Sequence, residues 1–236
     1  MCKLNKRIAA LIIILILCLA SFCASAANQS ARDRFIDQML ELAKETAADK
    51  KENFRRAHYK EDIGVCKNYV TYLFNMYKNR YVIGAFPSAS LRMPTNNPAE
   101  KCAPYDYGVE WADVSAQSGN PFTIAGSFRY NENMSEKANR RAAADMLRKA
   151  KRGDFLQLRG EYGGGNGPHS LIFIADCVSD KLRWADSNMT GKFIDGIRWG
   201  YVKYDTQASV EWMVDVICKP KYGATLYRLR SDLKYK

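Results

Sequence analysis

The sequence predicts an α+β domain in which helices come first and an antiparallel sheet follows. Two observations support this prediction. Before residue 153, apolar residues recur at intervals of three and four, which is the period of a helix. After residue 153, short segments rich in Val, Ile, Trp and Tyr follow one another, as strands do. Helices followed by a run of strands are typical of the α+β class.

The first residues have the layout of a secretory signal peptide. Basic residues at Lys3, Lys6 and Arg7 precede an apolar stretch, and the small-residue motif ASA follows at 24–26. We expect residues 1–26 to be removed by cleavage after Ala26, which leaves a secreted or periplasmic protein. A retained membrane anchor is the alternative, but the apolar run is short for the roughly 20 residues that span a bilayer.

The mature chain is expected to be basic. Residues 1–26 hold three of the 36 Lys and Arg and none of the 25 Asp and Glu, so 33 basic residues remain against 25 acidic ones, a net charge of +8. An exported basic protein is attracted to polyanions, and for a bacterial protein the nearest is the cell wall. The expected partner is therefore peptidoglycan or a peptide substrate, with no nucleic acid and no stable membrane anchor after signal cleavage.

Three helices are expected in the first part of the mature chain. Ser30 is a good N-cap for the amphipathic run 31–54. A second helical pattern follows Cys66. The third begins after the N-cap Ser135, gathers basic residues toward its C-terminus and stops at Gly153.

An irregular insertion and a sheet complete the predicted domain. Residues 84–133 are rich in Pro, Asn, Gly and Ser, and they include the short segment PFTIAGSF. We interpret them as an irregular insertion within a single domain, residues 27–236. The expected strands are 154–160, 170–177, 181–188, 198–204 and 209–218, with a further one at 223–230.

Four cysteines remain once the signal peptide is removed. They are Cys66, Cys102, Cys177 and Cys218, and they would lie in an oxidising compartment. One interpretation is two disulfides. The other is a free Cys66 with a single bridge among the other three.

The candidate active site combines Cys66 with one of only two histidines. A helix N-terminus and a nearby imidazolium lower a cysteine pKa from about 8.5 to roughly 3.5–7.5, which yields a nucleophilic thiolate. His58 lies in a charged, surface-like stretch, whereas His169 opens a predicted strand after a Gly-rich loop. Asp186 and Asn188 share one face of a later strand, and a hairpin turning at 178–181 would bring them beside His169 to orient it.

Four segments in this order resemble the blocks of papain-like bacterial wall hydrolases of the CHAP and NlpC families. They are GVCKNYVTYLF, KRGDFLQL, GPHSLIFIADC and LRWADSN. The pairing of Asp186 with an Asn two residues later is closer to CHAP. Val65 before the cysteine departs from both families, and Lys67-Asn68 after it departs from the NlpC pattern.

The resemblance implies a papain-like fold and a role for each candidate residue. Cys66 would be the nucleophile, His169 the base, and Asp186 the orienting group, with Asn188 supporting or replacing it. The expected activity is that of an exported cysteine amidohydrolase or peptidase acting on peptidoglycan amides. Two alternatives remain: a transglutaminase-like acyl transferase, and a non-catalytic wall-binding module stabilised by disulfides.

The sequence predicts no metal and no cofactor. The glycine run at 163–167 lacks the GK[ST] ending of a phosphate-binding loop and leads into a strand instead of a helix. No His and Cys cluster has the spacing of a zinc site.

Overall fold

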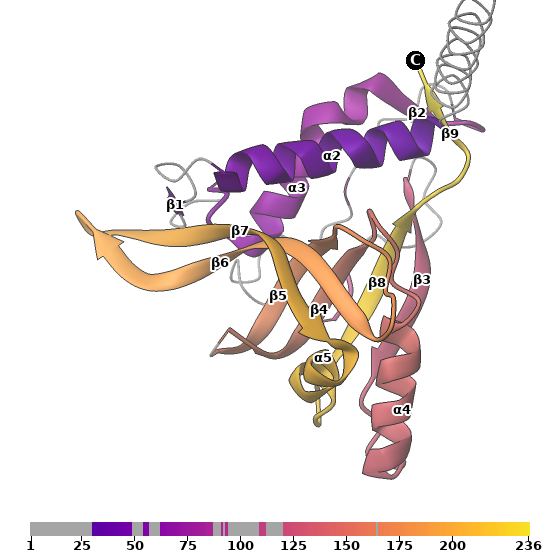
Figure 1. Cartoon of the computed structure of the whole chain (residues 1–236), viewed down its shortest axis with the longest axis vertical. Helices are drawn as coiled ribbons and strands as arrows, with labels where there is room; N and C mark the ends of the chain where they lie inside the picture. Colours follow the sequence, from indigo (N-terminus) through magenta and orange to yellow (C-terminus); the bar gives the residue numbers. More distant parts are fainter. Residues whose placement is uncertain are drawn as a thin grey trace, which may run out of the picture.

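A computed structural model describes residues 30–48, 54–56, 62–86, 91, 93, 109–111, 120–163 and 165–236 (Figure 1). The predicted signal peptide, His58 and Cys102 lie outside these ranges. Within them, no helix combines the length and the apolar content needed to cross a membrane.

A seven-stranded sheet forms the centre of the molecule, in the order β1-β7-β6-β5-β4-β8-β3. Every neighbouring pair in it is antiparallel. A two-stranded sheet pairs β2 (Tyr81–Ile83) with β9 (Leu233–Tyr235). The strands of the large sheet are β1 (Phe54–Arg56), β3 (Phe122–Arg129), β4 (Phe155–Tyr162), β5 (Gly165–Phe173), β6 (Lys181–Ile194), β7 (Ile197–Ser209) and β8 (Gly223–Leu229).

Helices cover both faces of this sheet, which confirms the α+β class. On one face lie α2 (Ala31–Ala48) and α3 (Cys66–Tyr77), which continues into the 3-10 turn η1 (Lys78–Arg80). On the other lie α4 (Glu136–Leu147) and α5 (Val210–Ile217) (Figure 1). Each pair of helices buries its own hydrophobic core against the sheet.

The predicted N-caps at Ser30 and Ser135 are confirmed. The Ser30 hydroxyl accepts the amide N–H of Asp33 at 3.0 Å, and the Ser135 hydroxyl accepts that of Ala138 at 3.2 Å. The third helix, α4, ends at Leu147 instead of reaching Gly153.

Gly153 does not end a helix, but its backbone conformation and its close packing both require glycine. Its φ is +84°, and a Cβ there would lie 2.6 Å from the side chain of Ile36. Only glycine accepts both the left-handed backbone and this close approach. Gly153 thus lets the chain turn beneath α2 into β4.

The prediction of a strand at 209–218 is wrong, because Val210–Ile217 forms the helix α5. The Ser209 hydroxyl caps it by accepting the amide N–H of Trp212 at 3.1 Å. Its β-branched residues favoured a strand, but the burial follows helical spacing. The buried residues are Val210, Met213, Val214, Val216 and Ile217.

The irregular stretch is shorter than 84–133, because Phe122–Arg129 is strand β3 of the main sheet. This strand lies at the edge of the sheet and pairs only with β8. Its register shifts between Ile124 and Gly126, so inward and outward positions do not alternate along it. Because buried and exposed positions do not alternate, the sequence of this segment lacks the two-residue hydrophobic period that identifies a strand.

Candidate active site

Cys66 opens helix α3, as the sequence predicts. The N-cap residue is Val65, whose side chain makes no capping hydrogen bond. The carbonyl of Asp62 fixes the preceding turn by accepting the amide N–H of Val65 and the side-chain N–H of Asn68, both at 3.1 Å. At the start of this helix, the backbone of Lys67 forms a hydrogen bond with the sulfur of Cys66.

The segment before Cys66 crosses strand β7 at Gly200. A Cβ on Gly200 would lie 2.0 Å from the carbonyl oxygen of Gly64. Any other residue at position 200 would therefore push this segment, and Cys66 with it, away from the sheet.

His169 and Asp186 lie on neighbouring strands, β5 and β6. Both are buried, at 3% and 1% exposure. The Nε2 atom of His169 lies 2.8 Å from Oδ2 of Asp186. The strands are joined by a tight turn in which Ser179 and Asp180 have positive φ, so the hairpin predicted at 178–181 is confirmed.

The sheet opens beside this pair. Strands β5 and β6 pair only through Leu171–Phe173, and pairing ends where Leu171 meets Asp186. Beside Leu171 on β5, the backbone of Ser170 forms a hydrogen bond with the sulfur of Cys66. The gap is where the N-terminus of α3 meets the sheet.

The thiol of Cys66 contacts the imidazole of His169 beside the gap between β5 and β6. Leu171 and Phe173 belong to the core on the α5 face, and Ile172 belongs to the core on the α3 face. By alternation, His169 points to the α5 face. The Cys66 thiol, at the start of α3, forms a hydrogen bond with this imidazole where the pairing of β5 with β6 has ended.

The thiol and the imidazole shift each other's protonation. Burial raises the pKa of Cys66, but the charge and hydrogen bond of His169 outweigh it, with help from the N–H groups of Ser170 and Lys67, so the net pKa is lowered. Burial lowers the pKa of His169, but the Cys66 charge and Asp186 outweigh it and raise that pKa to about 9. Together these shifts favour a thiolate beside an imidazolium near neutral pH.

Tyr162 belongs to the site although the sequence analysis did not identify it. Its hydroxyl donates to Oδ2 of Asp186 at 2.6 Å and accepts the indole N–H of Trp184 at 2.9 Å. Its ring stacks on His169 with centroids 4.0 Å apart and 16° between planes. Burial and the charge of Asp186 raise the Tyr162 pKa, so the hydroxyl stays protonated as a donor.

Asn188 lies on the same strand as Asp186, and its amide group lies next to Gly163. Gly163 has a φ of +65°, and a Cβ there would meet the Asn188 amide nitrogen at 2.4 Å. Among the described residues, the carboxylate bonded to His169 is that of Asp186, whose second oxygen, Oδ1, has no hydrogen-bond partner. The amide group of Asn188 thus lies next to Gly163, and its supporting role at the imidazole stays a prediction.

A buried polar network holds β5 in place from the opposite face. The side-chain oxygen of Gln157 accepts the hydroxyl of Ser170 and, at 3.0 Å, the indole N–H of Trp111. Since Ser170 follows His169 directly, these bonds fix the strand that carries the imidazole.

The Gly-Asp pair of the second block has a structural role. Both carboxylate oxygens of Asp154 accept hydrogen bonds from Arg228, at 2.8 and 2.6 Å, and Oδ2 also accepts the amide N–H of Lys151. This buried ion pair ties the start of β4 to β8.

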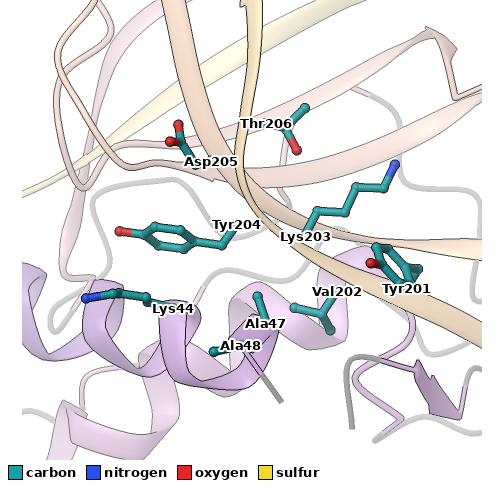
Figure 2. Close-up of a pocket in the computed structure, with 9 residues that line it drawn as sticks. All are labelled: Lys44, Ala47, Ala48, Tyr201, Val202, Lys203, Tyr204, Asp205 and Thr206. Atoms are coloured by element: carbon teal, nitrogen blue, oxygen red, sulfur yellow. The ribbon is translucent and has the colours of Figure 1, made fainter. Parts of the chain in front are cut away.

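A separate hollow of about 410 Å³ lies between α2 and β7 (Figure 2). It is lined by Lys44, Ala47 and Ala48 of α2 and by residues 201–206 of β7. Neither Cys66 nor His169 is among the residues that line it. Figure 2 shows the ammonium group of Lys203 pointing away from α2.

The cysteines of the described residues are free thiols. They are Cys66, Cys177 and Cys218, so none of the three is bridged to another. In this part of the chain, no cluster of three or more His, Cys, Asp or Glu is placed to hold a metal ion.

No protein-family model, curated protein or solved structure matches this chain.

Proposed function

We propose that the protein is an exported cysteine amidohydrolase or peptidase that cleaves amide bonds of bacterial peptidoglycan. One observation carries the proposal: the free thiol of Cys66 hydrogen-bonds to a buried imidazole, whose Nε2 lies 2.8 Å from the buried carboxylate of Asp186. A nucleophile, a base and an orienting group in series are the parts that acyl transfer requires.

The arrangement of elements supports a papain-like fold of the CHAP kind. A cysteine opens a helix, and the histidine and the acid follow on neighbouring antiparallel strands. The helix packs on these same two strands, β5 and β6. The four sequence blocks that resemble the CHAP and NlpC families occur in this order.

In the proposed mechanism, the Cys66 thiolate attacks the carbonyl carbon of the scissile amide. The resulting oxyanion accepts hydrogen bonds from amide N–H groups at the N-terminus of α3. His169 then donates its proton to the leaving amine and the C–N bond breaks, which leaves a thioester.

Water completes the cycle. His169, now neutral, takes a proton from a water molecule that attacks the thioester, and the carboxylic acid leaves as the thiolate and imidazolium re-form. Because Nε2 is held by Asp186, the Nδ1 atom of His169 is the one that faces the thiol and moves the proton.

The experiment is an assay of the mature protein on purified bacterial peptidoglycan. Free amines should accumulate with time, and prior treatment of the protein with iodoacetamide should prevent their release. A labelled primary amine added to the same reaction should stay free. Incorporation of that amine into the wall would identify a transglutaminase instead, and amine release that survives alkylation would exclude a thiol enzyme.

The pH dependence of hydrolysis should be bell-shaped. As the pH falls through the lowered pKa of Cys66, the thiolate gains a proton and kcat/KM decreases. As the pH rises through about 9, His169 loses the proton that the leaving amine needs, and kcat/KM decreases again. A profile that only rises, through the ordinary thiol range near about 8.5, would contradict the ion pair.

Replacing Tyr162 by phenylalanine should reduce kcat/KM about 10-fold, since a hydrogen bond to a charged group contributes about 1.5–3 kcal/mol. The ring remains to stack on His169, but Asp186 loses the donor at 2.6 Å. The carboxylate becomes a stronger acceptor, so the alkaline limb should move to higher pH. Tyr204→Phe, on β7 at the α2 hollow, is the control and should leave both quantities unchanged.

A further inference from the structure

A second pocket, of about 540 Å³, lies on the α5 face directly beside the candidate active site. It is formed by the end of β4, the first part of β6, the second half of β7 and the start of α5. Tyr162 and Asn188 are among its lining residues. The pocket therefore shares its wall with the residues that surround the imidazole.

Tyr162 connects the pocket to the reacting groups. One face of its ring stacks on His169. Its hydroxyl donates a hydrogen bond to Asp186, the carboxylate that bonds to His169. A molecule in the pocket is thus adjacent to an amide held at the thiol, so the pocket is placed to bind a neighbouring part of the same substrate.

The wall of this pocket is aromatic and is open to solvent at Trp212. The rings of Trp184 and Trp212 stack with centroids 6.2 Å apart, and Tyr162 meets Trp212 edge-on at 6.0 Å. Trp184 is buried, whereas Trp212 is 42% exposed. An exposed tryptophan backed by a second ring is a rigid apolar surface on which a ligand can pack.

Among the described residues that line this pocket, the charged one is Lys203. It lies opposite Asp186 in the β6–β7 register, and its ammonium group points away from α2 (Figure 2). No carboxylate of the described residues forms an ion pair with it. Lys203 therefore places a positive charge at the pocket, beside the amide groups of Asn188 and Gln207.

We propose that this pocket binds an acidic residue of the substrate peptide that flanks the scissile amide. Its carboxylate pairs with Lys203, its backbone amides hydrogen-bond to Asn188 and Gln207, and its apolar part packs on Trp212. The inference rests on the proposed function, because it places this residue next to the bond that Cys66 attacks.

Two blocked peptides test the pocket: acetyl-Ala-Glu-Ala-Ala-amide and the matched peptide with Gln in place of Glu. Each is titrated into the Cys66→Ala protein, and the indole N–H signals of Trp212 and Trp184 are followed by NMR. The Glu peptide should shift both signals and bind about 3- to 5-fold more tightly, as expected for a solvent-accessible ion pair. Lys203→Gln should remove this preference, and Lys137→Gln, on the exposed first turn of α4, should keep it.

Two outcomes would overturn the inference. One is equal binding of the two peptides, or a preference for Glu that survives Lys203→Gln. The other is binding of an N-acetylglucosamine tetramer at Trp212 that ignores Lys203, which would make the pocket a glycan site. Because the titration uses a protein without its thiol, it does not depend on turnover: a correct pocket with no amine release by the wild type would refute the proposed function alone.

Discussion

Replacing Cys66 by alanine should abolish amide hydrolysis, with kcat/KM falling about 10⁴-fold or more, as expected when the nucleophile of a catalytic triad is removed. No other group in the site can form the acyl intermediate. The change removes one half-buried sulfur at the start of α3, so the free energy of unfolding should change by less than about 1 kcal/mol. Amine release from peptidoglycan and a urea unfolding curve measure the two effects.

Cys177 provides the matched control. It is also a half-buried free thiol, but burial and the charge of Asp180 raise its pKa. Cys177→Ala should retain full activity. If Cys66→Ala kept measurable turnover on the same substrate, or if Cys177→Ala lost it, the nucleophile would be assigned to the wrong residue.

Replacing His169 by glutamine should have the next largest effect, a loss of about 10³-fold or more in kcat/KM. Glutamine can still donate a hydrogen bond to Asp186, so the buried carboxylate keeps a partner. It carries no charge, however, and cannot give a proton to the leaving amine, a contribution of about 10²- to 10⁴-fold. Without the imidazolium, the pKa of Cys66 should also rise, because its burial is no longer offset.

The reactivity of Cys66 separates this effect from misfolding. Near neutral pH, iodoacetamide should modify Cys66 rapidly in the wild-type protein and at least about 10-fold more slowly in His169→Gln, because thiolate is the reacting form. Cys177 serves as the internal reference and should react slowly in both proteins. An unchanged rate at Cys66 would mean that His169 does not activate it.

The reacting residues could be predicted because each has a local signal. Cys66 follows a glycine at the start of an amphipathic run, and His169 opens a strand after a glycine-rich loop. The tight turn at 178–181 then sets which residue of β6 faces β5, and it brings Asp186 to the imidazole. These features depend on residues close together in the sequence.

Tyr162 could not be predicted in the same way. It reaches Asp186 only because β4, β5 and β6 are adjacent and because β5 separates from β6 beyond Leu171. Asn188 shares a strand face with Asp186 by alternation, and its amide group lies next to Gly163, just after β4. Both contacts depend on the three-dimensional arrangement of strands and not on spacing.

The fold predictions were wrong where a local preference opposed the tertiary structure. Residues 210–217 are rich in Val and favoured a strand, yet they form α5 because packing on β4 and β7 buries one helical face. Strand β3 lies at the sheet edge with an irregular register, so its period could not be recognised. Neither error affects the site, which lies on α3, β5 and β6.

The most direct test of the thiolate–imidazolium pair is the ionisation of Cys66, followed by thiolate absorbance near about 240 nm as the pH changes. The difference between wild type and Cys66→Ala isolates this one thiol. The wild-type thiol should titrate well below the ordinary cysteine value of about 8.5, and the same titration in His169→Gln should move up to that value or above it. A Cys66 that titrates in the ordinary range in both proteins would contradict the proposed activation of the nucleophile.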